Sequence, residues 1–384
     1  MKDFQCSAMA IYVLSGVLIV TAAVTASLYL PPLKCKGQNE EGARNVVVQT
    51  SASPAFYPET QWMLGKISSG RRCSANQSNH NVQHRNRANC PNQSSFMHKI
   101  ATEYSQWRNG QSPITLVAVG CNKGDSIVEA MRMFSFNSEI STVKWYNKLK
   151  DELGEKARGA CQKAYVRDSA IPKEMTPRPV RAYCIEPAKS TFEVISRISK
   201  DLEYSQFGLS IIHGACAERE TVLSFPVVDP GKENMRLVAG QSDQTKYDLV
   251  NVTTIDHLTE RENLSVIDFL SVDTEGHDFP VLLGAVLTLA TKTVRVIEFE
   301  YHVVGRWKAA RIEELLDYLD NLGFDCYWEN NQGALLRMTG CYSEQMTVPE
   351  FKSWSNAICV NRREESLAQF MESLASQAGF GADL

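Results

Sequence analysis

The stretch FLSVDTEGHDFPVLLGA, residues 269–285, places three acidic side chains and a histidine between two apolar runs. The first run has the composition of a buried strand, and the second has that of a helix. Because proline is tolerated in the first turn of a helix, Pro280 predicts that a helix opens there. The polar residues therefore lie where a strand turns into a helix, which is where α/β proteins place ligands.

The rest of the chain from Ile114 onward alternates between predicted strands and helices. The strands are predicted at 114–120, 181–186, 208–215, 266–273 and 293–302, with a closing pair at 324–329 and 356–361. This alternation is typical of a parallel sheet with helices on both faces. The fold class is therefore α/β.

The sequence also predicts where several helices begin and end. Asp125 is a plausible N-cap, and the apolar residues that follow it repeat at helical spacing. Ser190 and Glu193 fit a capping box for the helix after the second strand. A leucine-rich helical stripe begins at Ile312 and is closed by Gly323.

Four parts are expected along the chain. They are a membrane anchor at 1–31, a low-complexity stem at 32–112, a catalytic domain at 113–364 with an insertion over the site at about 135–180, and a tail at 365–384. The anchor rests on the uncharged run 7–30, which as a helix would extend about 36 Å. A cleaved signal peptide is the alternative. In the stem, Cys73, His80, His84 and Cys90 are candidate zinc ligands, although their spacing fits no standard finger. A Cys73–Cys90 disulfide, or no specific role, is preferred.

Different features of the sequence favour opposite sides of the membrane for the catalytic domain. Lys34, Lys36 and Arg44 follow the apolar run and favour a cytosolic domain, whereas eleven cysteines and four Asn-x-Ser/Thr acceptor triplets favour the lumen. The acceptor residues are Asn76, Asn92, Asn251 and Asn263. We expect a single-pass protein with a catalytic domain in the Golgi or endoplasmic reticulum lumen. The formal charge of −4 and pI near 6.0 argue against a nucleic-acid partner.

Polar residues also follow the first two strands. Gly120 and Gly124 enclose a short turn in which the backbone can approach a ligand, and Asn122 and Asp125 offer polar contacts. Glu186 ends the second strand, where a carboxylate can accept hydrogen bonds from a ribose diol. An adenosyl cofactor fits this pattern better than NAD, because the turn lacks the three-glycine dinucleotide fingerprint.

Several motifs together resemble the FkbM family of S-adenosylmethionine-dependent methyltransferases. They are LVAVGCNKGDS, AYCIEPAKSTFEVI, HGACAERETVLSF and the long segment VTTIDHLTERENLSVIDFLSVDTEGHDFPVLLGA followed by VIEFEYH. Asp273, Glu275 and Gly276 fall on the family's Asp-x-Glu-Gly motif. The C-terminal segments TGCY and WSNAICVNR resemble eukaryotic members that have an N-terminal anchor.

The resemblance implies a class I methyltransferase fold, which is a Rossmann-like, mostly parallel sheet with a reversed last strand. It also implies S-adenosylmethionine as cofactor and a hydroxyl of a glycan or small metabolite as acceptor. By matched position, Gly120, Asn122 and Gly124 would contact the methionine part, Glu186 the ribose and Ala215 the adenine. The family has an acid where this chain has Ala118, so Asp125 is the candidate to replace that contact.

Methyl transfer requires a base for the acceptor proton, and Asp273 and His277 are the candidates, with Glu275 orienting either one. His277 or Asp278 could instead only cap the following helix. No metal ligand is assigned, although Asp273 and Glu275 could hold Mg²⁺ or Mn²⁺, as in an anchored glycosyltransferase. A non-catalytic binding module that keeps the fold is a third hypothesis.

Residues outside the motif carry weaker predictions. Glu298, Glu300 and His302 end the fifth strand on the same rim, and His302 is either an acceptor-site residue or structural. Cys326 and Cys341 are expected to pair in an oxidising compartment. Cys121 and Cys184 are expected to be buried free thiols.

Overall fold

The computed structural model describes Met97 and residues 99–103, 113–159, 166–238, 243, 245–291, 293–329, 335–341 and 355–377. The predicted anchor at 7–30 and the stem cysteines and histidines lie outside these residues. Within them, no helix is both long enough and apolar enough to cross a membrane.

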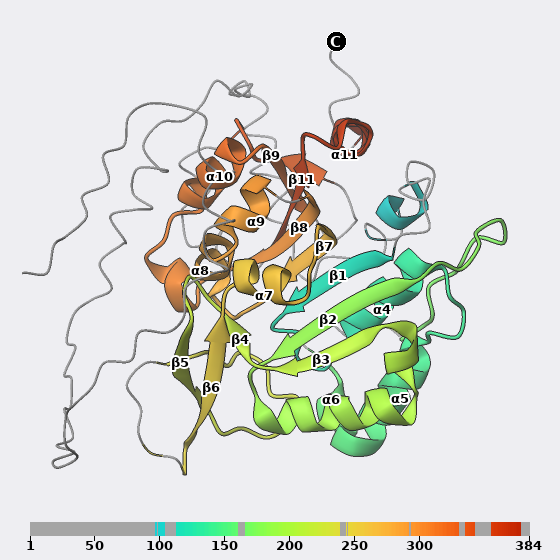
Figure 1. Cartoon of the computed structure of the whole chain (residues 1–384), viewed down its shortest axis with the longest axis vertical. Helices are drawn as coiled ribbons and strands as arrows, with labels where there is room; N and C mark the ends of the chain where they lie inside the picture. Colours follow the sequence, from blue (N-terminus) through green and yellow to red (C-terminus); the bar gives the residue numbers. More distant parts are fainter. Residues whose placement is uncertain are drawn as a thin grey trace, which may run out of the picture. The chain divides into compact units, whose positions relative to one another are not determined.

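A central eight-stranded sheet organises the domain (Figure 1). Its strands, in spatial order, are β10 (Leu335–Arg337), β9 (Phe324–Glu329), β11 (Ser355–Asn361), β8 (Thr293–Tyr301), β7 (Val266–Val272), β1 (Ile114–Val119), β2 (Val180–Glu186) and β3 (Leu209–His213). Strands β3, β2, β1, β7 and β8 run parallel, whereas β11 is antiparallel to both of its neighbours. The last strand is thus reversed and inserted between β8 and β9, as the class I methyltransferase fold requires.

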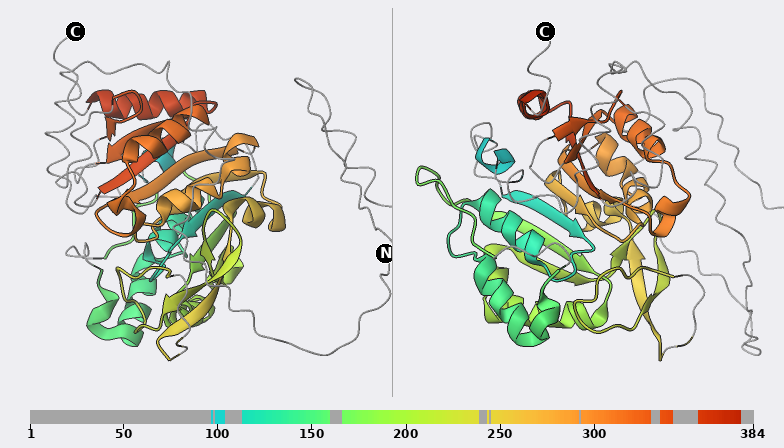
Figure 2. Two further views of the ribbon diagram at one scale, coloured as in Figure 1. Left: turned by 90° about the vertical axis from the view of Figure 1, so that its left-hand side faces the viewer. Right: turned by 180° about the vertical axis from the view of Figure 1, so that it is seen from behind.

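Helices cover both faces of this sheet (Figure 2). They are α4 (Asp125–Ser135), α5 (Thr142–Leu153), α6 (Lys189–Asp201), α7 (Ile255–Arg261), α8 (Asp278–Leu283), α9 (Val286–Thr291), α10 (Ile312–Asn321) and α11 (Glu365–Gln377). Residues of α4, α6 and α11 share one core cluster, and residues of α7 to α10 share the other. Short 3₁₀ turns occur at Gly154–Ala157, Tyr204–Phe207 and Gly305–Lys308.

Strand β1 shows why a central strand of this sheet has a continuous apolar sequence. Successive side chains point to opposite faces of a strand. Leu116 and Ala118 accordingly pack in the first core cluster, while Val117 and Val119 pack in the second. Since both faces are covered, every residue of β1 is buried.

A smaller sheet lies beside the carboxyl end of β2 and consists of β4 (Ala215–Cys216), β6 (Tyr247–Thr253) and β5 (Thr221–Pro226), in that order (Figure 1). Strand β5 is antiparallel to β6, and β4 is parallel to it. Phe225, Val250 and Val252 form its small apolar core together with Ala188 and Ala215. This sheet supplies one wall of the site described below.

Two predicted helix caps are wrong. Gly124, in the left-handed conformation, is the N-cap of α4, and Asp125 is the first helical residue. Ala188 is the N-cap of α6, and the Ser190 hydroxyl donates instead to the Val228 carbonyl at 2.7 Å. The predicted end of α10 is correct, because Gly323 follows it with φ of 91°.

The domain boundaries also differ from those expected. Leu367 and Met371 of α11 are buried in the first core cluster, so residues 365–377 are part of the domain and not a tail. Met97 and Ile100 of the predicted stem are buried in the same cluster. In the predicted insertion, α5 packs against α4 and α6 rather than over the site.

The disulfide predictions are wrong as well. Cys121 pairs with Cys184, which joins the turn after β1 to the neighbouring strand β2. Cys326 pairs with Cys359 across the antiparallel strands β9 and β11, and not with Cys341. Among the described residues, Cys216 is a free, buried cysteine.

Candidate active site

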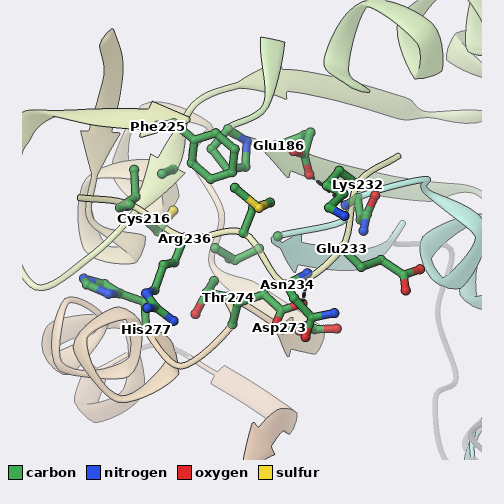
Figure 3. Close-up of a pocket in the computed structure, with 18 residues that line it drawn as sticks. Glu186, Cys216, Phe225, Lys232, Glu233, Asn234, Arg236, Asp273, Thr274 and His277 are labelled. Atoms are coloured by element: carbon green, nitrogen blue, oxygen red, sulfur yellow. Dashed lines mark hydrogen bonds between the residues drawn. The ribbon is translucent and has the colours of Figure 1, made fainter. Parts of the chain in front are cut away.

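A pocket opens at the carboxyl ends of β1, β2 and β7 (Figure 3). The space between its lining residues, together with the open solvent at its mouth, is about 630 Å³. The predicted site residues that line it are Gly120, Asn122, Glu186, Ala215, Asp273, Glu275 and His277. Gly124 and Asp125 are not among the lining residues.

Gly120 sets the distance between the ends of β1 and β7. Its φ is 78°, and a Cβ added there would lie 1.9 Å from the Asp273 carbonyl oxygen. The Asp273 backbone N–H also donates to the Val119 carbonyl at 2.9 Å. Only glycine allows this close approach, which brings the backbone of Asp273 against the turn.

Two backbone N–H groups hold the carboxylate of Glu186 in place. One carboxylate oxygen accepts from the Asn122 N–H at 2.8 Å, and the other accepts from the Ala188 N–H at 2.8 Å. The side chain is 5% exposed. Burial raises the pKa of Glu186 to about 7, against the opposing effect of these two hydrogen bonds.

Asn122 and Gly124 have different roles in the turn. The Asn122 side-chain oxygen is buried without a hydrogen-bond partner, which is unusual and marks a position available to a ligand. A Cβ on Gly124 would lie 2.8 Å from the Trp145 ring, so Gly124 allows α5 to pack on the turn. Ala118, which replaces the family's acid, is buried in the core, and Asp125 does not line the pocket in its place.

The segment 231–238, between β5 and β6, passes across the pocket (Figure 3). Lys232, Asn234 and Arg236 belong to it and were not predicted as site residues. Glu233 forms an ion pair with the buried Lys123, and the Asn234 N–H donates to Glu275 at 2.9 Å. The sequence held no signal for this cover, because a polar loop between two strands has no distinguishing pattern. Cys216 and Phe225 of the small sheet complete the apolar wall and were also missed.

Asp278 holds the loop between β7 and α8 in place. Its two oxygens accept from the Thr274 N–H at 3.3 Å, the Gly276 N–H at 3.2 Å and the Trp307 ring N–H at 3.2 Å. Burial, with a smaller contribution from Asp273, raises the pKa of Asp278 to about 8. Asp278 therefore stabilises this loop and does not cap the helix, because the groups that donate to it are Thr274 and Gly276 before α8 and the distant Trp307 ring. His277 is the N-cap residue of α8, but its side chain makes no capping bond.

Asp273, Glu275, Asp278 and Glu300 lie close enough that the charge of one carboxyl group affects the pKa of its neighbours. The pKa of Asp273 is raised because surrounding protein removes part of its hydration, although the side chain is exposed to the pocket. Burial and then Asp273 raise the pKa of Glu275 to about 7. Burial raises the pKa of Glu300 well above its usual value, and Glu300 shares a hydrogen bond with Asp273.

The two histidines occupy different positions. His277 lines the pocket, and burial followed by the charge of Arg306 lowers its pKa. His302 follows β8, is 7% exposed and does not line the pocket. Burial lowers the pKa of His302 to about 4, so its ring is neutral near pH 7.

A family model for the Methyltransferase FkbM domain matches residues 159–326. Among solved structures, the chain is similar to the methyltransferase FkbM from Methylobacillus flagellatus KT, with 10% sequence identity and a TM-score of 0.35. The similarity covers 79% of this chain and 58% of that chain, so this chain spans little more than half of its length. No curated protein matches.

The sheet order and the position of the pocket define an α/β fold of the class I methyltransferase type. Residues 159–326 match the model of the Methyltransferase FkbM domain, the family that the sequence motifs resemble. This segment contains Glu186, Ala215, Asp273 and His277 but begins after the Gly120 turn. The roles assigned to individual site residues stay predictions.

Proposed function

We propose that the protein transfers a methyl group from S-adenosylmethionine to a hydroxyl oxygen of a glycan or a small metabolite. One observation carries this proposal. Glu186 and Asp273 end the two strands that flank β1, and both line one pocket with Gly120 between them. A single small molecule can therefore contact both carboxyl groups.

The residues present fit this cofactor. Each Glu186 oxygen accepts one backbone hydrogen bond and retains a lone pair for a ribose hydroxyl. Ala215 and Phe225 offer an apolar wall for the adenine ring. The unpartnered Asn122 side-chain oxygen can accept a hydrogen bond from the cofactor's amino group.

S-adenosylmethionine supplies a methyl group on a sulfonium. Asp273 lies at the pocket surface as the general base, and it accepts the hydroxyl proton as the acceptor oxygen becomes methylated. Its raised pKa makes it a better base near neutral pH, and general-base catalysis contributes about 10²- to 10⁴-fold. His277 is the second candidate base, because it lines the same pocket and is neutral at pH 7.

The test is calorimetric titration of the full chain with S-adenosylmethionine. We expect one saturable site that Glu186→Gln weakens at least tenfold, because the amide removes the charge that strengthens the ribose hydrogen bonds. Glu193→Gln, an exposed acid on α6, is the matched control and leaves binding unchanged. Absence of binding in the parent protein would refute the proposal. Binding of a UDP-sugar in its place would favour a glycosyltransferase, and cofactor binding without turnover would favour a binding module.

We also propose that the catalytic domain is lumenal and anchored through the uncharged run 7–30. The Cys121–Cys184 and Cys326–Cys359 disulfides support an oxidising compartment. Asn251 and Asn263 head acceptor triplets and are exposed. A shift of the full-length protein on endoglycosidase treatment is the expected result, and an unglycosylated protein made in eukaryotic cells would contradict it.

A further inference from the structure

Three side chains from the ends of β7 and β8 converge beside the pocket. They are Glu275 after β7, Glu300 near the end of β8, and His302 just beyond it. One ligand atom of each lies within 4.8 Å of the other two. Of the three, only Glu275 lines the pocket.

Two of these side chains are buried with a polar atom that lacks a partner. Glu300 is 8% exposed and His302 is 7% exposed, and neither Glu300 Oε2 nor His302 Nε2 forms a hydrogen bond. The two atoms nevertheless face each other at 3.3 Å. Buried polar atoms almost always have partners, so this pair calls for an explanation. A positive ion between the carboxylate oxygen and the ring nitrogen would satisfy both.

The distances fit a metal ion. With metal–ligand bonds of about 2.1 Å, two atoms 3.3 Å apart subtend about 100°, close to a tetrahedral angle. His302 Nε2 and Glu275 Oε2 are 4.0 Å apart. To reach the same angle with His302, the Glu275 carboxylate needs to move less than about 1 Å toward the ring nitrogen. Its side chain is 23% exposed and has room to do so.

The backbone holds these ligands together. Gly276 and Gly305 pack so closely that a Cβ on Gly276 would lie 2.4 Å from the Val304 carbonyl oxygen. The Arg306 N–H donates to the Gly276 carbonyl at 2.9 Å. Glu275 itself has φ of 55°, a conformation that non-glycine residues adopt rarely and that clusters at functional sites. The loop that carries Glu275 is thereby fixed against the loop that follows His302.

We propose that Glu275, Glu300 and His302 bind one divalent cation of the Mn²⁺ or Zn²⁺ type. One imidazole and two carboxylates suit these ions better than Mg²⁺ or Ca²⁺, which prefer ligand sets made of oxygen alone. Three protein ligands leave coordination positions open. Because Glu275 lines the pocket, a cation held here would lie next to the proposed methyl-transfer site, but cation binding itself does not depend on that function.

The experiment titrates the metal-free full chain with Mn²⁺ and follows the loss of the free-ion electron paramagnetic resonance signal, with no cofactor present. Mn²⁺ is the probe because the cysteines and histidines of segment 73–90 could bind Zn²⁺. We expect one saturable equivalent. Glu300→Gln and His302→Ala each weaken it about 100-fold or more, since even outer-shell changes reduce metal affinity 10- to 100-fold.

Two controls make the result specific. Glu298→Gln removes a buried acid from the same strand and face, where Glu298 instead accepts from the Asn356 amide at 2.8 Å. His257→Ala removes an exposed histidine that pairs with Glu220 at 2.8 Å. Both controls retain Mn²⁺ binding. If Glu300→Gln or His302→Ala does not fold, the part-exposed Glu275→Gln replaces it and must show the same loss.

Lack of stoichiometric binding at millimolar Mn²⁺ would overturn the proposal, and so would equal binding by the parent and the ligand variants. The affinity of His302→Ala for S-adenosylmethionine distinguishes failure of the cation proposal from failure of the proposed function. His302 does not line the pocket, so that affinity stays unchanged whether or not a cation binds.

Discussion

The contact between Gly120 and Asp273 can be tested by adding one methyl group. In Gly120→Ala the new Cβ would lie 1.9 Å from the Asp273 carbonyl oxygen, whereas such contacts are not observed below 3.0 Å. The backbone must therefore move by about 1 Å, which disturbs the hydrogen bond from Asp273 to Val119. Gly323→Ala is the matched control, because Gly323 has φ of 91° and no atom near the position of its Cβ.

Both substitutions place alanine in the left-handed region, at a cost of about 1–2 kcal/mol. Gly120→Ala adds an overpacking term of about 1–3 kcal/mol, and loss of one backbone hydrogen bond adds about 1 kcal/mol. We expect Gly120→Ala to lower the free energy of unfolding by about 3–6 kcal/mol and Gly323→Ala by about 1–2 kcal/mol.

Urea unfolding of the two full-length variants, followed by tryptophan fluorescence, measures the difference. Calorimetry on the same samples tests the site, where Gly120→Ala weakens S-adenosylmethionine binding at least tenfold and Gly323→Ala leaves it unchanged. If the two variants are equally stable, the close approach of β1 and β7 described above is wrong.

Three further predictions concern the pocket and the loops around it. Because ribose hydroxyls would bind the ionised form of Glu186, whose pKa is raised to about 7, cofactor affinity should be constant above that pH and fall up to tenfold per pH unit below it. A flat profile in calorimetry from pH 6 to 8 would argue against this role. Asp278→Ala leaves the backbone N–H groups of Thr274 and Gly276 without this acceptor, whereas the Trp307 ring N–H still donates to the Glu300 carbonyl. The substitution should lower the free energy of unfolding by about 2–4 kcal/mol, and a change under about 0.5 kcal/mol in urea would contradict its structural role. Replacing both Cys121 and Cys184 by serine opens a link between residues 63 apart and should cost about 2–4 kcal/mol, and mapping of disulfide-linked peptides that finds these cysteines unpaired would refute the pairing.

Much of the fold could be predicted from local patterns. A strand buried on both faces is a continuous apolar run, so β1 and β7 are visible in the sequence. The reversed strand β11 and its pairing with β9 were also expected. Helix caps were harder, because the residue before Lys189 caps α6 without a side-chain bond and so has no sequence signature.

The acidic motif that follows β7 shows which features the sequence determined and which depended on the tertiary structure. Its side chains and their place after a strand are local, and the sequence by itself determined that Asp273 and Glu186 would stand at strand ends in an α/β sheet. Only the tertiary structure decided which of the acids face the ligand, because burial and hydrogen bonds with distant residues assign Asp278 to the loop and Asp273 to the pocket.

The same reason explains what sequence patterns could not supply. The cover at 231–238 and the meeting of Glu275 with His302 both join segments that are far apart along the chain. Their proximity follows from the packing of loops at one edge of the sheet, where Gly276 meets Gly305. No periodicity of 2 or 3.6 residues encodes such contacts, since those periods report only which face of an element is buried.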